Sequence, residues 1–204
     1  MTAERPSPFT ELYLDESVRA IQALDGAAID RVAAGLGRVR DAGGRLFVLG
    51  VGGSVGHASH AVNDFRKICA FEAYTPTDNV SELTARVNDE GWDTSFSEWL
   101  KVSRLAKSDA LLVFSVGGGN REKNVSVNLV RALEHAGVVG APVFGVVGKD
   151  GGTTAAVAEA CVIIPTVSPD RITPHTEGLC AVVWHLLVTH PALKRAATKW
   201  ESTK

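Results

Sequence analysis

The spacing of apolar residues predicts two helices in the first 42 residues of the chain. Apolar side chains recur every three or four positions on either side of the dipeptide Asp25-Gly26: Leu14, Val18, Ile21 and Leu24 before it, and Ile29, Val32, Leu36 and Val39 after it. This spacing places the apolar side chains of each segment on one helical face. Glycines at 43 and 44 are typical of a helix end, so the helical region should stop there.

After residue 44 the pattern changes to short apolar runs separated by longer amphipathic segments. The runs at 45–50, 110–115, 142–148 and 160–165 predict buried strands, and 71–74 is a weaker fifth candidate. The segments at about 54–68, 79–89, 93–106, 122–137, 151–158 and 175–189 predict helices. This alternation predicts an α/β fold, a three-layer α/β/α sandwich with a five-stranded parallel sheet, preceded by N-terminal helices. In such folds ligands bind at the carboxyl ends of the strands.

Length and composition limit the class of protein. A chain of 204 residues favours one domain, with a helical segment at 1–43 and an α/β core at 44–192. The formal net charge of −2 argues against nucleic acid as the main ligand. No apolar stretch is long enough to predict a membrane span, and the first residues lack a secretory signal. Three cysteines without CxxC spacing favour free thiols in a cytoplasmic protein.

The first candidate ligand site is the sequence Gly-Val-Gly-Gly-Ser at 50–54, between a predicted strand and a predicted helix. Glycines allow close approach of the backbone to a ligand, and a helix N-terminus attracts anions. Gly52, Gly53 and Ser54 are therefore candidate phosphate-binding residues. The turn is neither a Walker loop nor GxGxxG, and a tight turn required only for packing is the alternative.

A second glycine-rich turn, Ser-Val-Gly-Gly-Gly-Asn at 115–120, follows another apolar run. Three consecutive glycines are costly in backbone entropy, which favours a functional reason for them. The candidate phosphate-binding residues are Ser115, Gly117, Gly118, Gly119 and Asn120. The cations Arg121 and Lys123 follow, and they either neutralise a phosphate or lie on the solvated surface.

Candidate acid, base and metal-binding residues lie on two predicted helices. His60 and Asp64 share one face of helix 54–68, which also carries His57. They lie about 9–15 Å along the helix axis from the first glycine turn. Glu177 and His185 lie on roughly one face of the last helix. Together these residues suggest either an acid/base pair or a metal site. A surface hydrogen bond for His60 and Asp64, and a core position for His185, are the alternatives.

These motifs together resemble the phosphoheptose isomerases of the sugar isomerase (SIS) family. The matching segments are 49–54 with His60, 78–81, 88–91, 112–115, Gly-Lys-Asp-Gly-Gly at 148–152, and 173–187. The resemblance implies the SIS fold and an active site between the subunits of a homotetramer. It also implies an aldose–ketose isomerase that converts sedoheptulose 7-phosphate to D-glycero-D-manno-heptose 7-phosphate through an enediol, without a nucleotide cofactor.

By the same resemblance, Asp64 and His185 are the catalytic residues, and His60, Asp64, Glu177 and His185 would hold zinc. The chain departs from the family at these positions, because Asp64 replaces a glutamate and Glu177 replaces a glutamine. Val51 also replaces an asparagine in the first turn, and the second turn lacks its usual hydroxyl residues. A non-catalytic SIS protein that binds a sugar phosphate or associates with a replication initiator, and an isomerase of another phosphosugar, therefore stay open.

Overall fold

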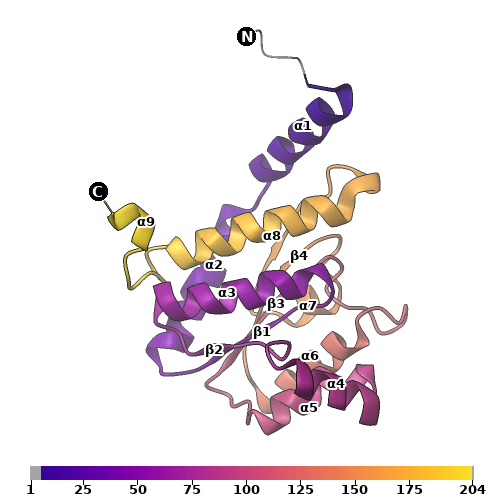
Figure 1. The fold of residues 1–204 in the computed structure, drawn as a ribbon, viewed down its shortest axis with the longest axis vertical. Helices are drawn as coiled ribbons and strands as arrows, with labels where there is room; N and C mark the ends of the chain where they lie inside the picture. Colours follow the sequence, from indigo (N-terminus) through magenta and orange to yellow (C-terminus); the bar gives the residue numbers. More distant parts are fainter. Residues whose placement is uncertain (1–5, 204) are drawn as a thin grey trace.

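The computed structural model describes residues 6–203 of the chain (Figure 1). The two N-terminal helices are α1 (Pro8–Gln22) and α2 (Gly26–Asp41). Ser7 caps α1 by accepting a hydrogen bond from the backbone N–H of Thr10. Asp25, which interrupts the apolar pattern, caps α2 through the N–H of Ala28 at 3.1 Å. Asp25, at the break between the two predicted helices, is therefore the N-cap residue with which the second helix begins.

A five-stranded parallel sheet forms the middle layer, in the order β2-β1-β3-β4-β5. Its strands are β1 (Leu46–Leu49), β2 (Ala73–Tyr74), β3 (Ala110–Ser115), β4 (Val143–Val147) and β5 (Ala160–Ile163). Every residue of the three central strands is buried, which explains why their sequences are continuous apolar runs. The predicted fold class is confirmed.

The remaining helices complete the two outer layers. They are α3 (Gly53–Cys69), α4 (Val80–Asp89), α5 (Ser95–Val102), α6 (Val127–Val139), α7 (Gly152–Val157), α8 (Ile172–Thr189) and the short C-terminal α9 (Lys199–Ser202). Two 3₁₀ turns, η1 (Trp92–Thr94) and η2 (Pro169–Arg171), precede α5 and α8. None of the described helices is long and apolar enough to cross a membrane.

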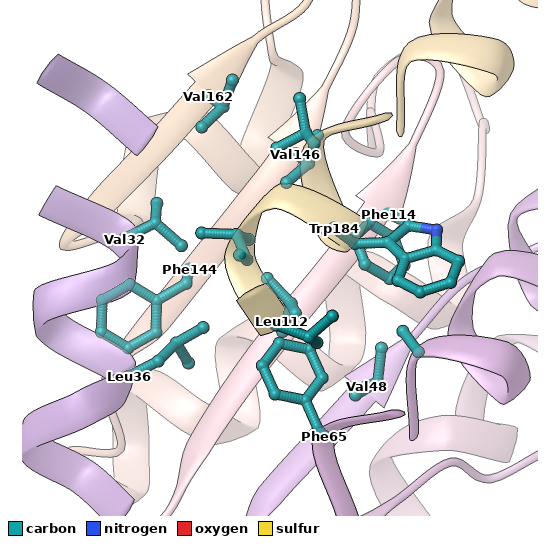
Figure 2. Close-up of a cluster of buried hydrophobic side chains, with 14 of the residues drawn as sticks. Val32, Leu36, Val48, Phe65, Leu112, Phe114, Phe144, Val146, Val162 and Trp184 are labelled. Carbon is teal, nitrogen blue, oxygen red and sulfur yellow. The ribbon is translucent and has the colours of Figure 1, made fainter. Parts of the chain in front are cut away.

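The two faces of the sheet have separate hydrophobic cores. Helices α2, α3 and α8 cover one face, where Leu36, Phe65 and Trp184 meet Leu112 and Phe144 from the strands (Figure 2). Helices α5 and α6 cover the other face, with Phe96, Leu100 and Leu133 against Phe47 and Leu111. The successive strand residues alternate between the two cores, as side chains of a β-strand must.

A buried ionic cluster attaches α1 to the beginning of α8. The Glu16 carboxylate accepts two hydrogen bonds of 2.7 Å from Arg171 and lies 2.8 Å from Nε2 of His175. The Tyr13 ring packs on the His175 ring at 4.6 Å between centroids. The rest of α1 projects away from the sheet (Figure 1). The cluster thus fixes the direction of a helix that has few other contacts.

Two predicted helix boundaries are wrong. The helix expected at 122–137 begins only at Val127, because Asn120 and Val125 pair with each other through two backbone hydrogen bonds of 2.9 Å. The helix expected at 93–106 ends at Val102, followed by Arg104 in a left-handed conformation (φ 54°). Helix α9 lies in a region without a clear pattern of apolar residues, and no helix was predicted there.

Candidate active site

The strand order places the two glycine-rich turns beside each other. β1 and β3 are adjacent parallel strands, with β2 on one side of the pair and β4 on the other. After β1 the chain enters α3 on one face of the sheet, and after β3 it continues to α6 on the opposite face. This is the switch point of an open parallel sheet, where a crevice forms beyond the carboxyl ends of the strands.

The first turn leads directly into a long helix. A Cβ atom at Gly50 would lie 2.3 Å from the carbonyl oxygen of Ser54, so only glycine allows this tight turn. Gly52 has φ 63° and precedes α3, whose first turn has no side-chain cap. The N-terminal N–H groups of the 17-residue helix therefore face the crevice region without a capping side chain. Ser54 is buried in the same turn.

The second turn is held in place by the start of α7. The Gly118 carbonyl accepts hydrogen bonds from the backbone N–H and the hydroxyl of Thr154, at 2.9 and 2.8 Å. The Gly119 carbonyl accepts the equivalent pair from Thr153, at 2.9 and 3.0 Å. Because the C=O and N–H groups of a trans peptide point in opposite directions, this attachment turns the corresponding N–H groups away from α7.

Some groups of the second turn are already used within the chain. The Ser115 hydroxyl accepts a hydrogen bond of 3.0 Å from the N–H of Gly118. Asn120 closes the following loop, because its side chain accepts a bond of 2.8 Å from the N–H of Lys123. Arg121 pairs with Glu134 on the surface. Within residues 6–203, the N–H groups of Gly117 and Gly119 donate no hydrogen bond, and they are the available donors for an anion.

His60, Asp64 and His185 form one compact group at the packed helices α3 and α8. Their ligand atoms all lie within 4.8 Å of one another, and His60 and His185 are exposed while Asp64 is half-buried. His60 Nε2 lies 3.8 Å from an Asp64 carboxylate oxygen, and the two imidazole rings meet edge to face at 5.5 Å. The Trp184 ring packs edge-on against the His60 ring, with 4.6 Å between the ring centroids, and so helps to hold the imidazole in place.

Hydrogen bonds orient two members of this group. His185 Nδ1 lies 2.7 Å from the carbonyl oxygen of Ala181 one turn earlier in α8, so this nitrogen carries the proton when the ring is neutral. The lone pair of His185 is then on Nε2, where it can accept a proton or bind a metal. Asn63 donates a hydrogen bond of 2.8 Å to one oxygen of Asp64. The second Asp64 oxygen faces His60.

Glu177 lies apart from this group. It is eight residues before His185, which corresponds to about 12 Å along a helix. Its carboxylate packs against the beginning of α3, since a Cβ atom at Gly53 would lie 2.4 Å from Glu177 Oε1. Of the four residues considered for a metal, the structure thus brings three together and places the fourth beside the first glycine turn.

A cavity of about 650 Å³ opens beside Asp64 and His185. Its wall includes Lys67 on α3, Thr189 on α8 and the C-terminal residues Thr198 and Glu201. The sequence did not predict that the C-terminal segment forms part of the wall of this cavity. Its sequence has no motif that predicts a position over α3 and α8, so only the tertiary structure reveals this contribution.

No protein-family model matches the chain, whereas individual relatives do. Lincomycin biosynthesis protein LmbN of Streptomyces lincolnensis is 34% identical over 152 residues. The match covers 72% of this chain and 55% of LmbN, so the chain spans about half the length of that relative. The phosphoheptose isomerase of Rhodospirillum rubrum is 32% identical over 151 residues, covering 72% of this chain and 74% of the relative.

The fold is also found among solved structures. The structure of a phosphoheptose isomerase from Neisseria gonorrhoeae superimposes with a TM-score of 0.76 at 24% identity. The similarity covers 88% of this chain and 95% of the other. At this level of identity the likeness concerns the fold, and it extends over nearly the whole of both chains.

Proposed function

The chain belongs to the phosphoheptose isomerase family, and we propose that it interconverts sedoheptulose 7-phosphate and D-glycero-D-manno-heptose 7-phosphate between α3 and α8. The observation that carries the proposal is the convergence of His60, Asp64 and His185 within 4.8 Å. His60 and Asp64 come from α3 and His185 comes from α8, two helices that are far apart in sequence. A carboxylate and an imidazole with a free lone pair are the groups that an aldose–ketose proton transfer requires.

The reaction moves one proton between carbons and one between oxygens. Asp64 takes the proton from C1 of the open ketose, and the electrons of that C–H bond form the C1–C2 double bond of an enediol. The C2 carbonyl oxygen receives its proton from Nε2 of His185, which enters this step with both ring nitrogens protonated and leaves it with the lone pair on Nε2. Asp64 then returns a proton to C2 while His185 removes the proton from the C1 hydroxyl. The aldose results, and both side chains regain their starting protonation states.

A divalent metal fits the donor set of this group. Two imidazoles and one carboxylate are typical zinc ligands, and three protein ligands leave a position open for substrate oxygens. We assign His60, Asp64 and His185 as the residues that would hold zinc, with Glu177 as a fourth ligand after a side-chain movement. Because only Nε2 of His185 is available, the proton transfer described above belongs to the state in which this nitrogen does not bind the metal. When bound, the ion would polarise the oxygens of the sugar as a Lewis acid.

The phosphate is assigned to the two glycine turns. The N-terminus of α3 at Gly53 and Ser54 attracts an anion. The Glu177 carboxylate lies beside Gly53 and would leave this position for the phosphate by the same side-chain movement that brings it to the metal. The N–H groups of Gly117 and Gly119, which donate to no acceptor within the described chain, supply the second side of the site. With the phosphate there, the sugar chain extends along α3 towards Asp64.

We further propose that the protein is a homotetramer with α1 in a subunit interface. Phe9, Leu14 and Val18 are 61, 58 and 50% exposed on this helix, which is unusual for large apolar side chains. A mass measurement in solution tests this assembly, and a monomer at micromolar concentration would refute it.

The proposed location is cytoplasmic. It is supported by three free cysteines, whose burial raises each thiol pKa to about 11 or 12.

The experiment is to incubate the purified protein with sedoheptulose 7-phosphate, with and without zinc, and to follow the sugar by NMR. Appearance of the heptose 7-phosphate aldose is the expected result. Binding detected by line broadening without conversion would refute the isomerase and favour a non-catalytic sugar-phosphate-binding protein. Conversion of another phosphosugar but not this one would refute the substrate while leaving the reaction type in place.

A further inference from the structure

Helix α3, which packs against α8, carries a histidine that the chemistry above does not use. The two helices pack side by side and run in the same direction (Figure 1). Gly53 meets Glu177 at their beginnings, and the Cys69 thiol lies 3.5 Å from the Val188 carbonyl near their ends. On α3, positions 53, 57, 60 and 64 recur at helical spacing and share one face. His57 therefore lies one turn after the phosphate turn and one turn before His60.

The surroundings of His57 place its ring between the two halves of the site. The ring centroid lies 6.5 Å from that of Phe114, the residue that precedes Ser115 in the second glycine turn. The charged and titratable groups that influence it are Glu177 on one side, and His60 and His185 on the other. Burial is the main cause of a pKa below the ordinary value of 6.5, opposed by Glu177 and reinforced by the other two histidines.

His57 has hydrogen-bonding capacity that the chain itself does not use. The ring is half-buried, and its nitrogens make no hydrogen bond to any residue between 6 and 203. A neutral imidazole offers one donor and one acceptor, which matches a sugar hydroxyl. A group in this position faces the middle of a ligand whose phosphate lies at Gly53 and whose reacting carbons lie at Asp64.

We propose that His57 is a substrate-binding residue that determines specificity by hydrogen bonding to the hydroxyls between the phosphate and the reacting carbons. This inference rests on the proposed function, because it assumes that a phosphorylated sugar lies along α3. A residue that holds the unreactive part of a substrate acts equally on ground state and transition state. Its loss should therefore raise KM and leave kcat nearly unchanged.

The test compares His57→Phe, which keeps the ring size but cannot hydrogen bond, with His57→Gln, which retains a donor and an acceptor. His135→Phe is the matched control, since His135 is also a half-buried histidine with a lowered pKa but lies on α6 across the sheet. Each variant is measured by thermal unfolding, by steady-state kinetics with sedoheptulose 7-phosphate, and by titration calorimetry with the same sugar.

The expected result is a KM about tenfold higher for His57→Phe, the loss of roughly one hydrogen bond, with kcat within about threefold of wild type. His57→Gln should recover most of this loss, and His135→Phe should change neither constant. An unchanged KM in a folded His57→Phe variant would overturn the inference, and so would a fall in kcat alone. If the wild type fails to turn over the sugar, the proposed function fails, and the calorimetric Kd values still test His57 by the same comparison.

Discussion

Replacement of Gly118 by alanine tests how the second glycine turn is built. Gly118 has φ 68°, a conformation that costs a residue with a side chain about 1 kcal/mol or more. An added Cβ atom would also lie 1.8 Å from the carbonyl oxygen of Gly151, far inside van der Waals contact. The backbone fixes the position of the Cβ atom, and the oxygen is itself a backbone atom, so no side-chain rotation can relieve the clash and the turn must move away from α7.

The cost follows from the hydrogen bonds that this movement would break. Four bonds attach the turn to α7, two to the Gly118 carbonyl and two to the Gly119 carbonyl. Each contributes about 1 kcal/mol net, so losing half of them adds about 2 kcal/mol to the conformational cost. We expect the free energy of unfolding to fall by about 3 kcal/mol, which corresponds to a Tm decrease of roughly 10 °C for a domain of this size.

Gly117→Ala is the matched control, because it makes the same chemical change one residue earlier. Gly117 does not have a positive φ, and nothing lies within 4 Å of an added Cβ atom. Urea and thermal unfolding of both variants should show Gly117→Ala within about 0.5 kcal/mol of wild type. Equal stabilities for the two variants would refute the attachment of the turn to α7.

Two further predictions concern charge and metal. Arg171, and then His175, lower the pKa of Glu16 from 4.5 to about 2. The stabilisation from this carboxylate is therefore present above pH 4.5 and is lost as the pH falls to 2, so the Tm difference between wild type and Glu16→Gln should shrink across that range. A Tm difference that stays constant between pH 4.5 and 2 would argue against the ion pair of Glu16 with Arg171. Zinc should raise the Tm of wild type and of His190→Ala but not of His60→Ala, whereas an equal rise in all three would place the metal elsewhere.

The architecture could be predicted because its signals are local. A buried parallel strand is a short apolar run, and each of the five strands follows a run identified in the sequence. The start of α6 could not be predicted in this way. Asn124 and Ser126 adopt left-handed conformations, and the Asn120 side chain captures the N–H of Lys123. Such specific turn geometry leaves no trace in the hydrophobic periodicity.

The sequence predicted which site residues share a face of one helix, but not which residues of different helices meet. The spacing of His60 and Asp64 places them on one face of α3, but the approach of His185 depends on how α3 packs on α8. Glu177 shares a face with His185, yet the rise of the helix separates them. The cluster of Glu16 with Arg171 was also missed, since its partners lie 155 positions apart in the sequence.

The central claim is that the carboxylate and imidazole between α3 and α8 perform the isomerisation. The direct measurement is kcat/KM for sedoheptulose 7-phosphate in Asp64→Asn and His185→Ala, beside the control variants Asp30→Asn and His190→Ala. Asp30 and His190 form a similar carboxylate–imidazole pair at 3.2 Å on another part of the surface. We expect a loss of about a hundredfold or more in each site variant and wild-type rates in both controls. Wild-type rates in Asp64→Asn or His185→Ala would contradict the catalytic role of these side chains.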